Sequence, residues 1–230
     1  AVDECFEAKV ARSQSILESK PKNLYRPPSR SHRWKVELQW QSAGLGISQY
    51  IDGEKQFVPF DSTPEAGSLL IGDMVQWVQT HPLPMERANL RFREGLGPIG
   101  GLWIDGSNYD VKSLLEDKDW IASFKEQGWH LEIGQKAKGV QFKKGRLGLG
   151  DPTPREWLPS FYKNRPIPLI SYIASFSQPG PEVNRMILKA GQELFYELSS
   201  MPKTWMEWGA GYGNLTASYA AFFAGKGVST

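Results

Sequence analysis

The residues with the clearest chemical pattern lie near the end of the chain, in Glu207–Asn214 (EWGAGYGN), where an acid precedes three alternate glycines. Apolar residues come before this motif, and a run of small residues with helical character, Leu215–Ala224, follows it. Glycine allows positive φ angles and a close approach of the backbone to a ligand. The free N–H groups at the start of a helix then bind the ligand's polar groups. The pattern predicts a strand, a glycine turn and a helix that hold a nucleotide-type cofactor.

Two related glycine motifs fit this segment less well, and a simple tight turn is the structural alternative. A phosphate-binding P-loop needs a Lys-Ser/Thr pair after its last glycine, and none is present. In the dinucleotide fingerprint the ribose-binding acid follows the glycines by about 20 residues, whereas Glu207 precedes them. That acid would lie past Thr230. We therefore expect the chain to end one βα unit into the domain that the motif opens.

Upstream, apolar periodicity and turn residues predict the elements that must position this motif. The alternation in Trp34–Trp40 (WKVELQW) is typical of a half-buried strand. Asp52-Gly53 and Asp105-Gly106 predict turns after strands. We expect helices at 5–19, 64–79, 111–126 and 181–198, strands at 34–40, 45–51, 56–60, 88–93, 100–104, 129–133, 139–142 and 170–174, and an irregular connector at 145–168.

Composition limits the chemistry that the chain can perform. The net charge is +2, and Cys5 is the single cysteine of the 230 residues, which excludes an internal disulfide framework and a cysteine-based zinc site. His32, His81 and His130 have no metal-ligand spacing, so we expect no metal site. No apolar run reaches the length of a membrane span, and no signal peptide is evident. These features indicate a cytoplasmic protein without a membrane partner.

Two basic segments interrupt the near-neutral composition. Lys20–Lys35 holds six Lys/Arg and no acid, and Gln135–Arg146 holds five and no acid. Aromatic residues such as Tyr25 and Phe142 lie among these cations, an arrangement that suits stacked bases and phosphates of RNA. A solvated surface is the equal alternative for each segment. The candidate RNA-binding residues are Arg26, Arg30, Arg33, Lys35, Lys136 and Lys138.

A second motif, Phe176–Asn184 (FSQPGPEVN), leads into the helix that precedes the glycine turn. Phe-x-Gln, a helix and then an acid with Gly-x-Gly-Asn resembles the RNA (uracil-5-)-methyltransferase family, whose members show Phe-Phe-Gln-x-Asn, a helix and Asp-Leu-Tyr-Cys-Gly-x-Gly-Asn-Phe. Ser31–Lys35 also resembles the start of that family's central domain. On this resemblance the residues that bind S-adenosyl-L-methionine are Gln178, Glu207, Gly209, Gly211, Gly213 and Asn214.

The resemblance implies an α+β central domain with an antiparallel sheet, followed by the start of a Rossmann-like α/β methyltransferase domain. Residues 1–165 would form the β-rich substrate side and residues 166–230 the incomplete cofactor side. The implied partner is RNA (rRNA or tRNA). The family's nucleophilic cysteine and its base would lie beyond Thr230, so the sequence predicts no catalytic residue here and an inactive isolated chain. No iron–sulfur cluster is expected, because Cys5 stands alone.

Three functions remain open at this point. The first is part of an S-adenosylmethionine-dependent RNA methyltransferase of the uracil carbon-5 type. The second is a non-catalytic RNA-binding module that keeps a vestigial cofactor turn. The third is a nicotinamide- or nucleotide-dependent enzyme with a similar glycine turn, and the Phe-x-Gln motif places it last.

Overall fold

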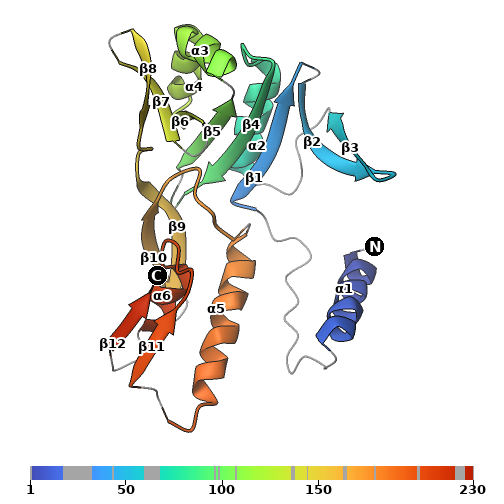
Figure 1. Cartoon of the computed structure of the whole chain (residues 1–230), viewed down its shortest axis with the longest axis vertical. Coiled ribbons are helices and arrows are strands. Elements are labelled where there is room, and N and C mark those ends of the chain that lie inside the picture. Colours follow the sequence, from blue (N-terminus) through green and yellow to red (C-terminus); the bar gives the residue numbers. More distant parts are fainter. Residues whose placement is uncertain are drawn as a thin grey trace.

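An eight-stranded sheet dominates the computed structural model, with strand order β3-β2-β1-β4-β5-β6-β7-β8 (Figure 1). The structure describes residues 2–17, 33–42, 44–59, 68–95, 97, 99–106, 108–135, 138–143, 145–162, 165–178, 180–200, 203–220 and 226–229. The eight strands are β1 Lys35–Gln41, β2 Gly44–Ile51, β3 Glu54–Pro59, β4 Arg87–Glu94, β5 Gly100–Gly106, β6 His130–Gln135, β7 Lys138–Lys143 and β8 Arg146–Gly150.

Neighbouring strands of this sheet are antiparallel except for β5 and β6, which run parallel. The sheet is therefore mixed, and the expectation of an antiparallel sheet was wrong at this pair. The reason is the connection: two helices lie between β5 and β6, and a helical crossover returns the chain in the same direction. Helix α2 lies in the connection from β3 to β4. The remaining sequential strands of this sheet are joined without a helix between them.

The alternation predicted for β1 is confirmed and defines the two faces of the sheet. Leu38 and Trp40 are buried, and Leu38 lies opposite Leu90 of β4. Together with Phe92 and Ile104 they belong to one large apolar core. The predicted Asp52-Gly53 turn is also confirmed: both residues have positive φ, 53° and 84°, which matches the right-handed twist of a tight hairpin.

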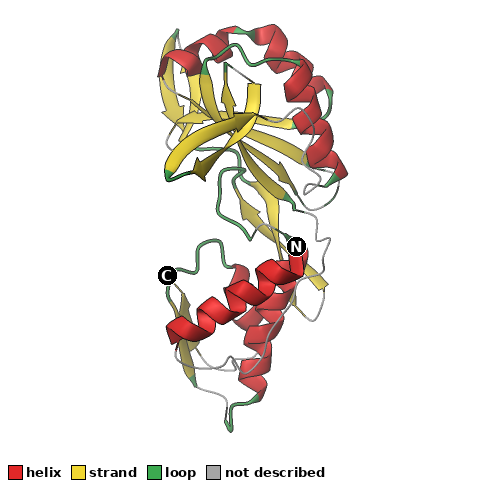
Figure 2. Ribbon diagram, turned by 90° about the vertical axis from the view of Figure 1, so that its right-hand side faces the viewer, coloured by secondary structure: helices red, strands yellow, loops and turns green. Residues whose placement is uncertain are grey.

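Three helices cover the apolar face of the sheet (Figure 2): α2 Leu69–Thr80, α3 Asn108–Glu116 and α4 Lys118–Glu126. Helix α2 begins later than predicted, because the Ser68 hydroxyl oxygen accepts the N–H of Ile71 at 3.2 Å and caps the helix. The single helix expected at 111–126 is two helices. Asp117 separates them, since its carboxylate accepts the N–H of Trp120 at 2.9 Å and caps α4.

Three further expectations were wrong. Asp105-Gly106 is no turn but the end of β5, paired with Asn89 and Ala88. The connector expected at 145–168 contains β8 and the antiparallel pair β9 Arg155–Tyr162 and β10 Arg165–Ser171. The strand expected at 170–174 ends at Ser171, where a turn begins. The prolines are the reason that no strand was predicted here, because proline lacks the N–H that a central strand requires. Pro159 and Pro168 lie opposite each other in a two-stranded sheet, where both strands are edge strands and proline is tolerated.

The C-terminal part comprises α5 Pro181–Tyr196, β11 Thr204–Glu207, α6 Asn214–Tyr219 and β12 Lys226–Ser229. Strands β11 and β12 pair in parallel (Figure 1), and α6 lies between them in the sequence. The chain thus contains one strand more than the single βα unit expected from the sequence. The remaining described element is helix α1 Val2–Leu17, and none of the described helices is long and apolar enough to cross a membrane.

Two small apolar clusters join the sheet to the C-terminal part. Trp157 of β9 packs with Trp103 of β5 and with Ile173. Trp34, which precedes β1, packs with Phe161 of β9 and Leu188 of α5, and Leu215 and Tyr219 of α6 cover this cluster. Residues far apart in the chain therefore fix the position of the glycine turn.

Candidate functional site

The glycine turn lies between the end of β11 at Glu207 and the start of α6 at Asn214. Gly209, Gly211 and Gly213 have φ angles of 70°, 58° and 81°. Most residues with a Cβ, alanine among them, are strained in this left-handed region. The N–H of Gly213 donates to the carbonyl of Ala210 at 2.9 Å, which closes the last part of the turn. The predicted strand, glycine turn and helix are present in this order.

The outer side of this turn is open. A Cβ placed on Gly209 or Gly211 would meet no atom within 4 Å. The glycines are thus required by the backbone conformation and not by crowding from the protein. A glycine turn with open space beside it allows a ligand to approach the backbone closely. This geometry fits the cofactor expected from the sequence.

A pair of amide side chains connects the two sequence motifs. Asn214 Nδ2 donates to Asn184 Oδ1 at 2.7 Å, and Asn184 Nδ2 donates to Asn214 Oδ1 at 3.1 Å. Asn184 is fully buried in α5. The hydroxyl of Ser160 on β9 also donates to the Asn214 carbonyl at 2.5 Å. The start of α6 is therefore held from two neighbouring elements.

The carboxylate of Glu207 faces the helix that follows the turn. Its Oε2 accepts the hydroxyl hydrogen of Thr216 at 2.5 Å, which links β11 to α6 across the glycines. Burial, and secondarily the charge of Glu207, raise the pKa of the Tyr219 phenol above its ordinary value. The protonated Tyr219 hydroxyl donates to the Ile187 carbonyl of α5 at 3.1 Å.

Gln178 is held through its backbone. Its carbonyl oxygen accepts the indole N–H of Trp34 at 2.6 Å. The side chain of Gln178 is half-buried, and no hydrogen bond of its amide to another described residue is present. The segment after it enters α5, whose Asn184 reaches the glycine turn. The predicted glutamine and the glycine turn are thus connected by one helix.

Two arginines of β4 hold the turn that precedes Gln178. Arg93 Nη1 donates to the carbonyls of Tyr172 at 2.8 Å and of Ile173 and Ser175 at 3.2 Å each. Arg91 Nη1 donates to the Ala174 carbonyl between them. Burial, and secondarily the charge of Arg91, lower the pKa of Arg93 to about 9, which leaves it protonated at neutral pH. The whole turn is fixed to the sheet by these two cations.

The candidate RNA-binding cations are distributed around the sheet, and three of them can be placed. Arg33 is exposed just before β1. Lys35 lies 2.9 Å from Glu37 and 5.6 Å from the centre of the Phe176 ring. Lys138 pairs with Asp151 at 2.9 Å. Arg26, Arg30 and Lys136 lie outside the described residues. The assignment of this set to RNA stays a prediction.

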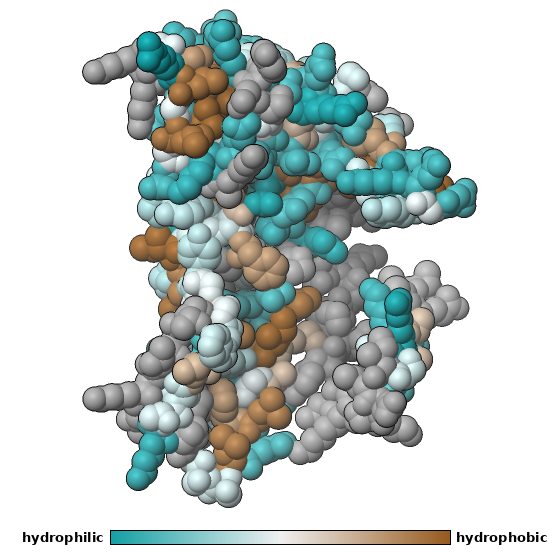
Figure 3. Space-filling view, viewed as in Figure 1, coloured by the Kyte–Doolittle hydropathy of each residue, from teal (hydrophilic) through white to brown (hydrophobic). Residues whose placement is uncertain are grey.

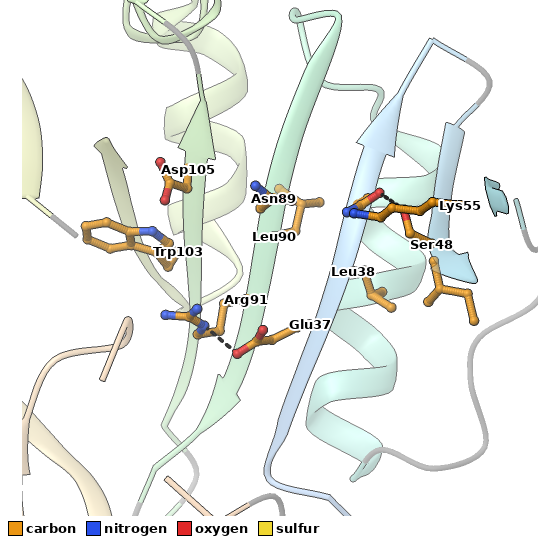
Figure 4. Close-up of a pocket in the computed structure, with 11 residues that line it drawn as sticks. Glu37, Leu38, Ser48, Lys55, Asn89, Leu90, Arg91, Trp103 and Asp105 are labelled. Carbon is orange, nitrogen blue, oxygen red and sulfur yellow. Dashed lines mark hydrogen bonds and ion pairs between the residues drawn. The ribbon is translucent and has the colours of Figure 1, made fainter. Parts of the chain in front are cut away.

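The face of the sheet opposite the helices carries polar side chains around a depression of about 660 Å³ (Figure 4). Sequence reasoning did not identify this surface. The only available signal was the polar half of the β1 alternation, which marks a face but not a hollow. Among the described residues, no three His, Cys, Asp or Glu side chains come together where they would hold a metal ion.

Two known proteins are similar to this chain, one in sequence and one in fold. No family model matches the chain. An uncharacterized RNA methyltransferase of Bdellovibrio bacteriovorus is 33% identical over 144 residues, which are 62% of this chain and 34% of that protein. A crystal structure of the Pyrococcus abyssi tRNA (uracil-54, C5)-methyltransferase with S-adenosyl-L-homocysteine matches with a TM-score of 0.60 and 13% identity, over 98% of this chain and 56% of that one. The resemblance of this chain to RNA methyltransferases is confirmed in sequence, and its fold is similar to that of a tRNA uracil-C5 methyltransferase.

This chain spans about a third of the bacterial RNA methyltransferase that it matches, 34%, and 56% of the archaeal structure. The latter likeness is one of fold. The sequence predicted the two cofactor motifs but not three of the residues that hold the glycine turn. These residues are Asn184, Ser160 and Thr216. Asn184 was part of the Phe176–Asn184 motif, but nothing in its spacing from Asn214 predicted an amide pair 30 residues apart.

Proposed function

We propose that the protein is an S-adenosylmethionine-dependent RNA methyltransferase that acts on carbon 5 of uracil. The observation that carries this proposal is the amide pair of Asn184 and Asn214, which connects the Phe-x-Gln segment to the open glycine turn. The sequence and fold similarities to RNA methyltransferases support it.

We assign the cofactor to Gln178, Glu207, Gly209, Gly211, Gly213 and Asn214. Open space lies beside Gly209 and Gly211, where a ligand can approach the backbone closely, and the Gln178 amide offers both a donor and an acceptor. Glu207 and Thr216 keep the strand and the helix on either side of the glycines in register. S-adenosylmethionine, when bound there, supplies an electrophilic methyl group.

We further propose that residues 1–165 form the substrate side and residues 166–230 the cofactor side of the enzyme. The substrate is RNA, either rRNA or tRNA, and the site of action is the cytoplasm. We assign no catalytic nucleophile within this chain, because its single cysteine, Cys5, is distant in sequence from both cofactor motifs.

Cofactor binding is tested by calorimetric titration with S-adenosyl-L-homocysteine. Gly211→Ala should weaken binding at least about tenfold, because alanine is strained at its φ of 58° and the turn must change shape. Gly128→Ala is the matched control: Gly128 has a φ of 82° and is remote from the turn, at the end of α4. Equal affinity of the two variants would reject the assigned loop.

Because the proposed nucleophile lies outside this chain, the acceptor is tested with the complete enzyme and RNA that carries tritium at carbon 5 of uracil. Methylation at this carbon forms a new carbon–carbon bond, releases the carbon-5 hydrogen to water and leaves S-adenosylhomocysteine. Release of tritium in step with methyl transfer supports the proposal. Methyl transfer without tritium release would identify another acceptor atom. RNA binding with neither cofactor binding nor transfer would favour a non-catalytic RNA-binding module.

A further inference from the structure

Three polar side chains form a row across the helix-free face of the sheet. Gln39 of β1 lies opposite Asn89 of β4, and Asn89 lies opposite Asp105 of β5. Adjacent strands in a sheet are about 4.8 Å apart, so the row offers an amide, an amide and a carboxylate at regular short spacing. Asn89 is exposed at its centre. In Figure 4 the side chains of Asn89 and Asp105 project from their strands on the side away from the helices.

The row crosses a hollow part of the surface. It lines the depression of about 660 Å³ and also an adjoining one of about 800 Å³, both of which include Ser48 and Lys55. Pockets of about 300–1,000 Å³ are the size that accommodates small ligands or a nucleotide-sized group. Trp103 closes one side, with its ring over Gly134, where any Cβ would lie 2.0 Å from a ring atom. Figure 3 shows hydrophilic residues over this upper part of the molecule.

The charges of this surface are balanced, which distinguishes it from a phosphate-binding patch. Arg91 pairs with Glu37 at 2.9 Å, and Glu37 also accepts from Lys35 at 2.9 Å. Although burial raises the pKa of Glu37, hydrogen bonds and charges from Lys35 and then Arg91 bring it below the ordinary value, so the pairs stay ionised at neutral pH. What the hollow offers is therefore hydrogen-bonding capacity rather than net positive charge.

Amide and carboxylate side chains are the groups that read base edges, because they match the donor and acceptor pattern of a base. In RNA such recognition requires an unpaired base, whose Watson–Crick edge is free. Ser48 donates to Gln39 Oε1 at 2.6 Å, which orients the Gln39 amide and directs its N–H groups to donate elsewhere. The chemistry of the row is thus complementary to a nucleobase.

We propose that Gln39, Asn89 and Asp105 bind the base edge of an unpaired nucleotide of the RNA substrate. This inference rests on the proposed function, since it takes RNA as the substrate. The position agrees with it: Arg91 lines the same depression and donates to the Ala174 carbonyl in the turn before Gln178. The base-reading hollow and the cofactor segment therefore share one side chain.

The test is fluorescence anisotropy with four short single-stranded RNAs that differ only in one central base, measured over a range of salt. The parent protein should prefer one base, and Asn89→Ala should reduce that preference by about tenfold while the salt slope is unchanged. Arg33→Ala, a change in a basic segment, should weaken all four RNAs and lower the salt slope. Gln76→Ala is the matched control, because this exposed amide lies on α2, which covers the opposite face of the sheet.

The outcomes separate the inference from the function on which it rests. RNA binding by the parent with no effect of Asn89→Ala or Gln39→Ala would overturn the inference alone. A uniform loss for all four RNAs in Asn89→Ala would also overturn it, because it would indicate a role without base selectivity. No RNA binding by the parent would overturn the proposed function as well. Unfolding midpoints in urea of all variants establish that each is folded.

Discussion

At the scale of single residues, the amide pair of Asn184 and Asn214 connects the end of the glycine turn to the buried side of α5. Each side chain donates one hydrogen bond to the other, and Asn184 has no exposed surface. Asn184→Leu keeps the branched shape of the side chain but leaves the Asn214 amide without this partner. We expect it to lower the free energy of unfolding by about 1–3 kcal/mol, measured by urea unfolding.

The double variant Asn184→Leu/Asn214→Leu supplies the internal control. Because both changes remove the same pair of hydrogen bonds, the second should cost less in the background of the first. Strict additivity of the two free-energy changes would mean that the amides contribute independently, and it would contradict the pair as the contact that holds the turn.

The sequence was informative about the turn itself and uninformative about what holds it. Alternate glycines after an apolar strand predict positive φ angles, and Gly209, Gly211 and Gly213 have them. The contacts of Asn184 and Ser160 depend on how α5 and β9 pack against α6, which is decided by tertiary structure. Likewise, Arg91 and Arg93 in the β4 alternation gave no sign that they would hold four carbonyls of a distant turn.

At the scale of elements, Asp117 decides that the chain between β5 and β6 forms two helices. Its carboxylate accepts the N–H of Trp120, which orients α4 so that Trp120 and Phe124 are buried. Asp117→Ala should lower the free energy of unfolding by about 1 kcal/mol, whereas Asp117→Ser should preserve most of the stability. Urea unfolding followed by circular dichroism measures both.

Asp119→Ala is the matched control for this cap. It removes a charge of the same sign from the first turn of α4, where Asp119 is exposed, but no N–H bond to its side chain is described. An equal loss of stability in Asp119→Ala and Asp117→Ala would mean that the effect comes from charge near the helix start and not from capping.

Elements with local signals were predictable, and those set by long-range pairing were not. The alternation in β1 and the turn at Asp52-Gly53 are determined by local sequence, so both were predicted correctly. Asp105-Gly106 has the same turn chemistry but is held extended by pairing with β4. The pair β9 and β10 was missed because its prolines indicate loops unless the strands lie at an edge.

At the scale of the whole molecule, the joint between the sheet and the C-terminal part contains a histidine. His130 of β6 lies edge-on to Trp157 of β9, with ring centres 5.9 Å apart. Burial, and secondarily the charge of Arg155, lower the pKa of His130 below its ordinary value of 6.5. The unfolded chain therefore binds this proton more readily than the folded one, and stability should fall as pH decreases below 6.5.

This pH dependence is measured from urea midpoints between about pH 7.5 and pH 5. His130→Gln removes the titrating group, so its midpoints should decrease less over this range than those of the parent. His81→Gln controls for loss of a histidine elsewhere, on the α2 side of the sheet. Parallel curves for His130→Gln and the parent would exclude His130 as a source of acid sensitivity.

The division into a substrate side and a cofactor side was the part of the architecture least determined by local sequence. The predicted boundary at 165/166 remains a proposal, and it falls inside the β9–β10 pair that packs on both sides. Trp157 contacts the sheet through Trp103, and Phe161 contacts α5 through Leu188. Such a joint is formed by apolar residues without a motif, so periodicity alone does not reveal it.

The Trp34 cluster also has a consequence for the order in which the chain folds during synthesis. A ribosome has already made all eight strands of the large sheet when it reaches Gly150, and the helices α2, α3 and α4 that cover it precede that point. Trp34 then still lacks Phe161 and Leu188, which emerge later. Because domains fold as units from the N-terminal end, we expect the large sheet to form first. Trp34 then becomes buried only when β9 and α5 have been synthesised and pack against it.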